Sequence, residues 1–195
     1  MIVAFKGYGV DFIVVGRVEL TASRLTDMVN EVETIALRDV VLEGLHDMAR
    51  VAVPDYSIRR DELLAVNGTG PRGATNRRIP TTGHRVQAQI GPYNVLGRLH
   101  TTAGDSIHDR LTSRGPMLPL TDATIAYVIG GILEVRDVPT ILINRDLVSW
   151  VRDEESHRLV LAPSLESVEP SGSAERVPVR PSPTPARRAR AGSPR

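Results

Sequence analysis

The chain has 195 residues, of which 41% are hydrophobic, and a net charge of +1. This length allows one ordinary domain or two very small ones, and the near-neutral charge indicates no class of partner. The absence of cysteine excludes a disulfide framework, a thiolate nucleophile and a cysteine-based metal site. The sequence shows neither a signal-peptide pattern nor an apolar run of about 20 residues, so we expect a cytoplasmic protein without a membrane partner.

The first 66 residues and a later segment share four blocks in the same order, which predicts a tandem repeat. VVGRVELTA at 14–22 aligns with VLGRLHTTA at 95–103, and LTDMVN at 25–30 with IHDRLT at 107–112. IALRDV at 35–40 then aligns with LPLTDA at 118–123, and the final IRRD at 58–61 with INRD at 143–146. We therefore predict that residues 1–66 and 84–163 are two copies of one unit.

Within each copy the apolar residues alternate, which is typical of strands with one buried face. In the second copy, strands are expected near residues 85–90, 93–102, 117–128, 132–143 and 147–151, with a helical turn within 106–114. The alternation slips by one residue at Asp39 and at Asp122, which predicts a β-bulge and a sharp bend at both positions.

Three further pairs of residues recur at structural positions of the two copies. Pro54 and Pro139 lack a backbone N–H, so each should lie on a sheet edge or at a bulge. Asp27 and Asp109 are expected to accept hydrogen bonds within a loop, while Asp61 and Asp146 fit a turn before the last strand.

The predicted fold class is all-β: two tandem small barrels of about five strands, packed against each other within the chain. A strongly bent sheet of this length closes on itself to remove exposed edges. Two units of about 65 residues would also gain stability by packing together. Residues 67–83 are predicted to be a linker, and the Pro/Arg-rich residues 164–195 a disordered tail.

At residues 110–112, 117–123 and 141–147 the second copy resembles a family of small bacterial domains of unknown function. The resemblance covers about 60 residues, and extends more loosely to the first copy. It implies an Sm-like or SH3-like barrel, and it brings no active site with it.

Chemistry-bearing residues are scattered rather than grouped. His84, His100 and His108 lie in the second copy with Asp105 and Asp109 nearby, but the first copy has Glu19 and Thr26 in place of the last two histidines. No nucleophile-and-base motif or phosphate-binding loop is found either. We therefore predict neither catalytic residues, nor a metal site, nor a cofactor, and we keep an enzyme or a metal-binding protein only as a third hypothesis.

Arginines provide the basis for a second hypothesis, nucleic-acid binding. The candidate contacts are Arg72, Arg77 and Arg78 in the linker, and Arg187, Arg188 and Arg190 in the tail. Since 23 of the 24 basic residues are arginine, with Lys6 the exception, these clusters also fit a general compositional bias. The leading prediction is a non-enzymatic binding or scaffolding protein whose partner is another protein.

Overall fold

The computed structural model describes residues 1–71, 80–112 and 115–161. The segment Met1–Pro163 forms one compact unit. The predicted disordered tail and residues 72–79 of the predicted linker lie outside the described residues. None of the helices in the described ranges is long and apolar enough to cross a membrane.

Most of the described residues lie in strands, as the alternation predicts. The first half contains β1 (Ile2–Tyr8), β2 (Phe12–Glu19), α1 (Leu25–Glu31), β3 (Thr34–Gly44), β4 (Arg50–Arg59), the 3-10 turn η1 (Arg60–Glu62) and β5 (Ala65–Asn67). The second half contains β6 (Thr81–Ile90), β7 (Tyr93–Thr102), α2 (Ile107–Thr112), β8 (Met117–Ile129), β9 (Ile132–Asn144), the 3-10 turn η3 (Arg145–Leu147) and β10 (Val148–Asp153), followed by β11 (Arg158–Leu161).

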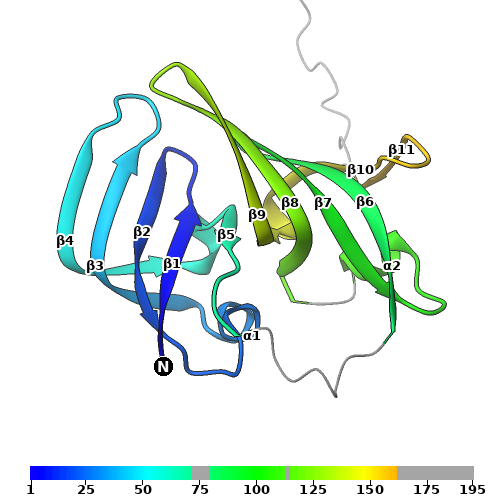
Figure 1. Cartoon of the computed structure of the whole chain (residues 1–195), viewed down its shortest axis with the longest axis horizontal. Helices are drawn as coiled ribbons and strands as arrows, with labels where there is room; N and C mark the ends of the chain where they lie inside the picture. Colours follow the sequence, from blue (N-terminus) through cyan, green and yellow to red (C-terminus); the bar gives the residue numbers. More distant parts are fainter. Residues whose placement is uncertain (72–79, 113–114, 162–195) are drawn as a thin grey trace, which may run out of the picture. The chain divides into compact units, whose positions relative to one another are not determined.

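The strands form one open antiparallel sheet in the order β11-β10-β6-β7-β8-β9-β5-β1-β2-β3-β4 (Figure 1). Each half has the same internal order, since β5-β1-β2-β3-β4 repeats as β10-β6-β7-β8-β9. The prediction of two separate barrels is not confirmed. Instead of closing on its own half, β5 pairs with β9 of the other half and joins the two into a continuous sheet.

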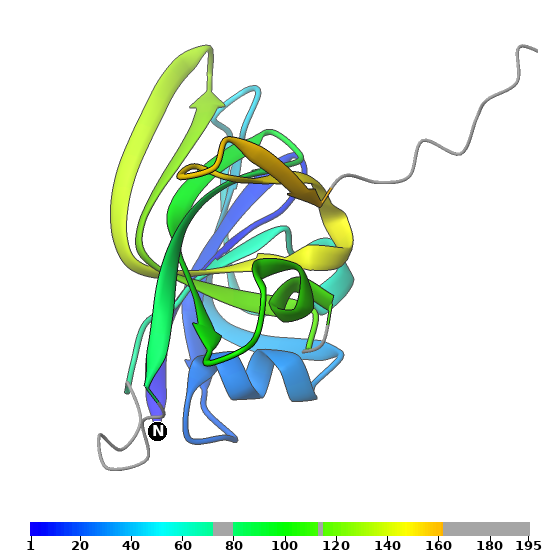
Figure 2. The same ribbon diagram turned by 90° about the vertical axis from the view of Figure 1, so that its right-hand side faces the viewer.

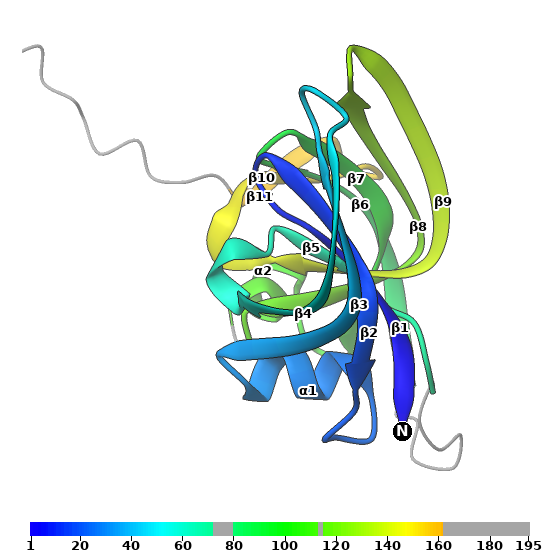
Figure 3. The ribbon, with the colours of Figure 1, turned by 90° about the vertical axis from the view of Figure 1, so that its left-hand side faces the viewer.

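The predicted bulges at Asp39 and Asp122 are confirmed. Both residues have positive φ angles, 52° and 47°, in the left-handed region that aspartate tolerates better than most residues. The register between β2 and β3 shifts at this point, as does that between β7 and β8. Pro54 and Pro139 lie within β4 and β9, opposite the two bulges. The long strands β3 and β8 are strongly bent (Figure 3).

Two apolar cores lie along the sheet, and each takes residues from the other half. Met117 and Leu142 of the second half are buried in the core that Phe5, Leu37 and Ile58 form in the first. Conversely, the core of the second half includes five residues of the first: Tyr8, Ile13, Leu45, Leu64 and Ala65. Separating the halves would expose both sets of side chains, so the two halves depend on each other for stability.

The β8–β9 hairpin lies over the outer face of the first half, where three tyrosines meet. The rings of Tyr8, Tyr93 and Tyr127 contact one another edge to face, with centroids 5.3–5.9 Å apart. The Tyr93 hydroxyl donates to the carbonyl of Gly9 over 2.8 Å. Burial raises the pKa of both Tyr8 and Tyr93, because the phenolate would lose its hydration.

Candidate binding surface

The arginines proposed to contact nucleic acid all lie outside the described residues: Arg72, Arg77, Arg78, Arg187, Arg188 and Arg190. The nucleic-acid hypothesis therefore stays a prediction. The histidines do not converge on a site. His84 and His100 hydrogen-bond to Thr101 and Thr121, and no group of three or more candidate metal ligands occurs within the described ranges.

The recurrent aspartates lie at turns, bulges and helix starts. Asp109 accepts bonds from the backbone and hydroxyl of Ser106, and these bonds lower its pKa. Asp27, in the corresponding helix α1, accepts a hydrogen bond from the hydroxyl of Ser23.

The other recurrent aspartates lie at turns and bulges. Asp61 and Asp146 lie in η1 and η3, the predicted turns before the last strands. The exposed Asp39 and Asp122 face Arg17 and Arg98 at 3.4 and 3.9 Å. These are local structural contacts.

The surface that distinguishes the two halves is the outer edge of β4 (Figures 1 and 3). In the described part of the chain no strand pairs with this edge, whereas the corresponding edge of β9 is paired with β5. The segment Ile141 to Ile143 of β9 lies opposite Ala65–Asn67. Its counterpart in β4, by order and register, runs from Tyr56 to Ile58.

Proline in β8 shows which way the backbone of β9 points. Pro119 lies opposite Leu142 and has no N–H, so these two residues cannot form a mutually hydrogen-bonded pair. The N–H and C=O of Leu142 must then point away from β8, toward Val66 of β5. Since such pairs alternate along an antiparallel ladder, residues 140 and 144 point the same way.

Two hydrogen bonds agree with this direction. The N–H of Asn144 donates to the carbonyl of Leu64, and the N–H of Gly68 donates to the carbonyl of Thr140, each over 2.8 Å. By the same register, Ala36 lies opposite Ser57. The N–H and C=O of Ser57 therefore point outward at the bare edge.

The counterpart of Asn144 in β4 is Arg59, whose N–H also points outward. The Glu62 carboxylate accepts this N–H over 2.8 Å, while the Arg59 side chain pairs with Asp61. The open stretch of the edge therefore ends at Arg59, where the chain satisfies its own donor. The three residues just before Arg59, Tyr56 to Ile58, are the counterparts of the three that β9 pairs with β5.

Side chains at the two edges differ in polarity. Met117 and Leu142, 1% and 0% exposed, face the core of the first half from β8 and β9. Their counterparts Thr34 and Ser57 are exposed and polar. The side chains at the covered edge are therefore apolar, and their counterparts at the bare edge are polar.

A cleft of about 460 Å³ borders the bare edge. It reaches Asp55, Tyr56 and Ser57 of β4, and α1 contributes Met28 to its lining, with Val32 just after the helix. The cleft is therefore partly apolar and adjoins outward-pointing backbone groups. This combination suits an extended peptide, whose backbone pairs with an edge while a side chain enters a neighbouring pocket.

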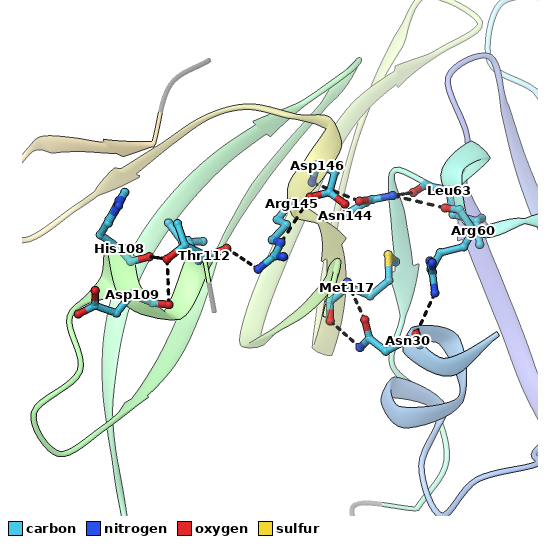
Figure 4. A network of polar contacts seen from close by, with 11 residues as sticks. Asn30, Arg60, Leu63, His108, Asp109, Thr112, Met117, Asn144, Arg145 and Asp146 are labelled. Atoms are coloured by element: carbon cyan, nitrogen blue, oxygen red, sulfur yellow. Dashed lines mark hydrogen bonds and ion pairs between the residues drawn. The ribbon is translucent and has the colours of Figure 1, made fainter. Parts of the chain in front are cut away.

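Asparagines hold the covered junction together (Figure 4). Asn30 of α1 donates to the carbonyl of Met117 over 3.0 Å and accepts from its N–H over 2.9 Å. Asn144, which is 3% exposed, donates to the carbonyl of Leu63 over 3.1 Å. Arg60 and Arg145 each donate to carbonyls at the end of the helix in their own half. The asparagines bridge the halves, and the arginines brace each half internally.

A second exposed surface lies on the face of the β8–β9 hairpin that points away from the first half. It consists of Val128, Leu133 and Val135, which are 53–65% exposed. Nothing in the described residues covers it.

Comparison of the chain with protein-family models, with curated proteins and with solved structures finds no match. The bare edge was not among the predicted sites. Its sequence signal is the difference between the copies, since Thr34 and Ser57 replace Met117 and Leu142 at matched positions.

Proposed function

We propose that this chain is a non-enzymatic binding or scaffolding protein, built from two copies of a curled five-stranded unit of the Sm-like or SH3-like kind, that binds a protein partner. The observation that supports this is the shared strand β5. Leu63 and Val66 pack in the core of the first half, while Leu64 and Ala65 pack in that of the second. The two units associate by pairing the edge of β9 with β5, and the matching edge of β4 has no partner among the described residues.

Site-specific photo-crosslinking in cells tests this function. A photo-crosslinking amino acid is placed at position 57 on the bare edge in one variant, and at position 135 on the exposed hairpin in another. Position 24, on the exposed surface before α1, serves as the control. We expect a discrete protein adduct from position 57 or 135 that position 24 does not give. Adducts only with nucleic acid, or none from either position, would overturn the proposal.

A further inference from the structure

The edge of β4 is a site for a linear peptide. We propose that residues Tyr56 to Ile58 accept an extended segment of a partner protein as an added antiparallel strand. This rests on the proposed function and names its site and the form of its ligand. The β9–β5 pair, which occupies the matching place in the second half, shows the geometry: three residues in antiparallel register, with the backbone of the middle residue directed at the incoming strand.

The side chains at this edge favour a single strand, rather than a second folded copy of the chain, as the ligand. At the covered edge, β5 is followed in the sheet by the rest of the first half, whose apolar core buries Met117 and Leu142. A second copy docked in the same way on β4 would enclose Thr34 and Ser57 instead, burying hydroxyls in an apolar core at a substantial free-energy cost. A lone strand leaves that face in water, where both hydroxyls remain hydrated.

The ligand's side-chain pattern follows from the register. The residue opposite Ser57 is polar, because it shares the wet face of the added strand. The residues on either side point to the face of Tyr56 and Ile58, where Ile58 is buried and the cleft adjoins Tyr56. At least one of these two is apolar and enters the cleft toward Met28.

The chain's own β5 supplies a probe. We would use a capped, fluorescent peptide of residues 62–69 with the replacement V66T, which puts a hydroxyl opposite Ser57. Binding to the full-length chain is followed by anisotropy. We expect saturable binding, and at least tenfold weaker binding to the Ser57→Pro variant, a loss of about 1.4 kcal/mol. Proline removes the outward N–H and leaves the ladder to β3 intact, since residue 57 does not donate to β3. The matched control, Ser57→Thr, should bind within about twofold of the parent chain.

Hydrogen exchange in the unmodified chain provides a readout that does not depend on the folding of a variant. Saturating peptide should slow exchange of the Ser57 amide at least tenfold. No saturable binding, equal binding to Ser57→Pro, or unchanged exchange would each overturn the inference. So would a dimer seen by sedimentation that Ser57→Pro abolishes, because the occupant would then be a second copy. Adducts from position 135 alone would leave the proposed function standing while removing this site.

Discussion

β9 and β4 occupy the same position in the two halves, but one edge is covered and the other is bare. On β9 the outward residue is Leu142, inserted into a neighbouring core, and on β4 it is Ser57, facing solvent. The backbone directions are the same, because both strands carry the same bulge-opposed proline and the same register. The backbone of each half thus allows an added strand to pair at this edge, and a few side chains determine which strand can bind there.

The outer faces of the two halves differ in the same way. Tyr8 in the first half is fully buried beneath the β8–β9 hairpin, and burial beside Arg136 lowers the pKa of Lys6 next to it. In the second half the counterparts are Gln89 and Gln87, and Gln87 accepts a hydrogen bond from Arg152 of β10 over 2.6 Å. Tyr8 is thus fully buried where the face is covered, whereas its counterpart Gln89 is half-buried.

Replacing Leu142 with serine should have the largest effect, because it gives the covered edge the side chain of the bare one. We expect the free energy of unfolding to fall by about 4 kcal/mol, from the lost apolar burial and from a hydroxyl left in the core. Urea unfolding followed by circular dichroism measures this. Ser57→Ala on the bare edge is the control and should change stability by less than about 0.5 kcal/mol. Similar losses in both variants would show that the two edges do not differ.

Alkaline pH should have the second-largest effect on the free energy of unfolding, because it ionises tyrosines that are buried at the covered face of the first half. Tyr8 and Tyr93 have raised pKa values in the folded chain, so their contribution is fully present below the unfolded pKa of 10.0 and is lost as the pH rises above it. One pH unit above 10.0, the loss is about 1.4 kcal/mol for each residue, or about 3 kcal/mol for the two. Urea unfolding at pH 9 and pH 11 measures this difference.

Tyr93→Phe provides the control for the alkaline effect. Removing one titrating hydroxyl should cut the difference between the two pH values by about 1.4 kcal/mol, whatever it does to stability at pH 9. An unchanged difference would assign the alkaline loss to other groups.

Asn30→Ala should have an intermediate effect, because Asn30 satisfies both backbone groups of Met117 across the junction. We expect a loss of about 2 kcal/mol, chiefly from leaving the buried N–H without its acceptor. The counterpart Thr112 bonds only within its own helix, to the carbonyls of His108 and Asp109. Thr112→Ala should therefore cost less than about 0.5 kcal/mol, and an equal loss in both would remove the special role of Asn30.

Local features of this fold were predictable from the sequence because they depend on short-range geometry. The slip in alternation at Asp39 and Asp122 marked the bulges, and the Arg-Asp pairs marked the turns before β5 and β10. The pairing of β5 with the other half was not predicted, because alternation does not specify which strand lies alongside. A signal was present in the run Leu63 to Val66, whose unbroken apolar character is typical of a strand buried on both faces.

β11 was missed for a different reason. It is short and pairs with β10 in the way that β9 pairs with β5, since Val151 lies opposite Leu161 as Val66 lies opposite Leu142 (Figure 2). β11 is the last strand at the far end of the sheet and covers the edge of β10. The counterpart of β5, which is β10, therefore has no unpaired edge within the described residues. Its sequence lies beyond the repeated blocks, and the comparison of the copies therefore does not reach it.

Ser57→Leu should have the smallest effect on stability, and it tests whether the polarity of residue 57 keeps a second copy away from β4. Residue 57 is exposed, so we expect a change below about 0.5 kcal/mol in urea unfolding. The variant gives β4 the outward leucine of β9, but a second copy offers no free β5-like edge, because β11 already pairs with β10. Sedimentation velocity should therefore show the same species for the variant and the parent chain. If Ser57→Leu alone produced a dimer, a strand of the second copy would have paired with β4. The polarity of residue 57, rather than the pairing of β11, would then be what keeps copies apart.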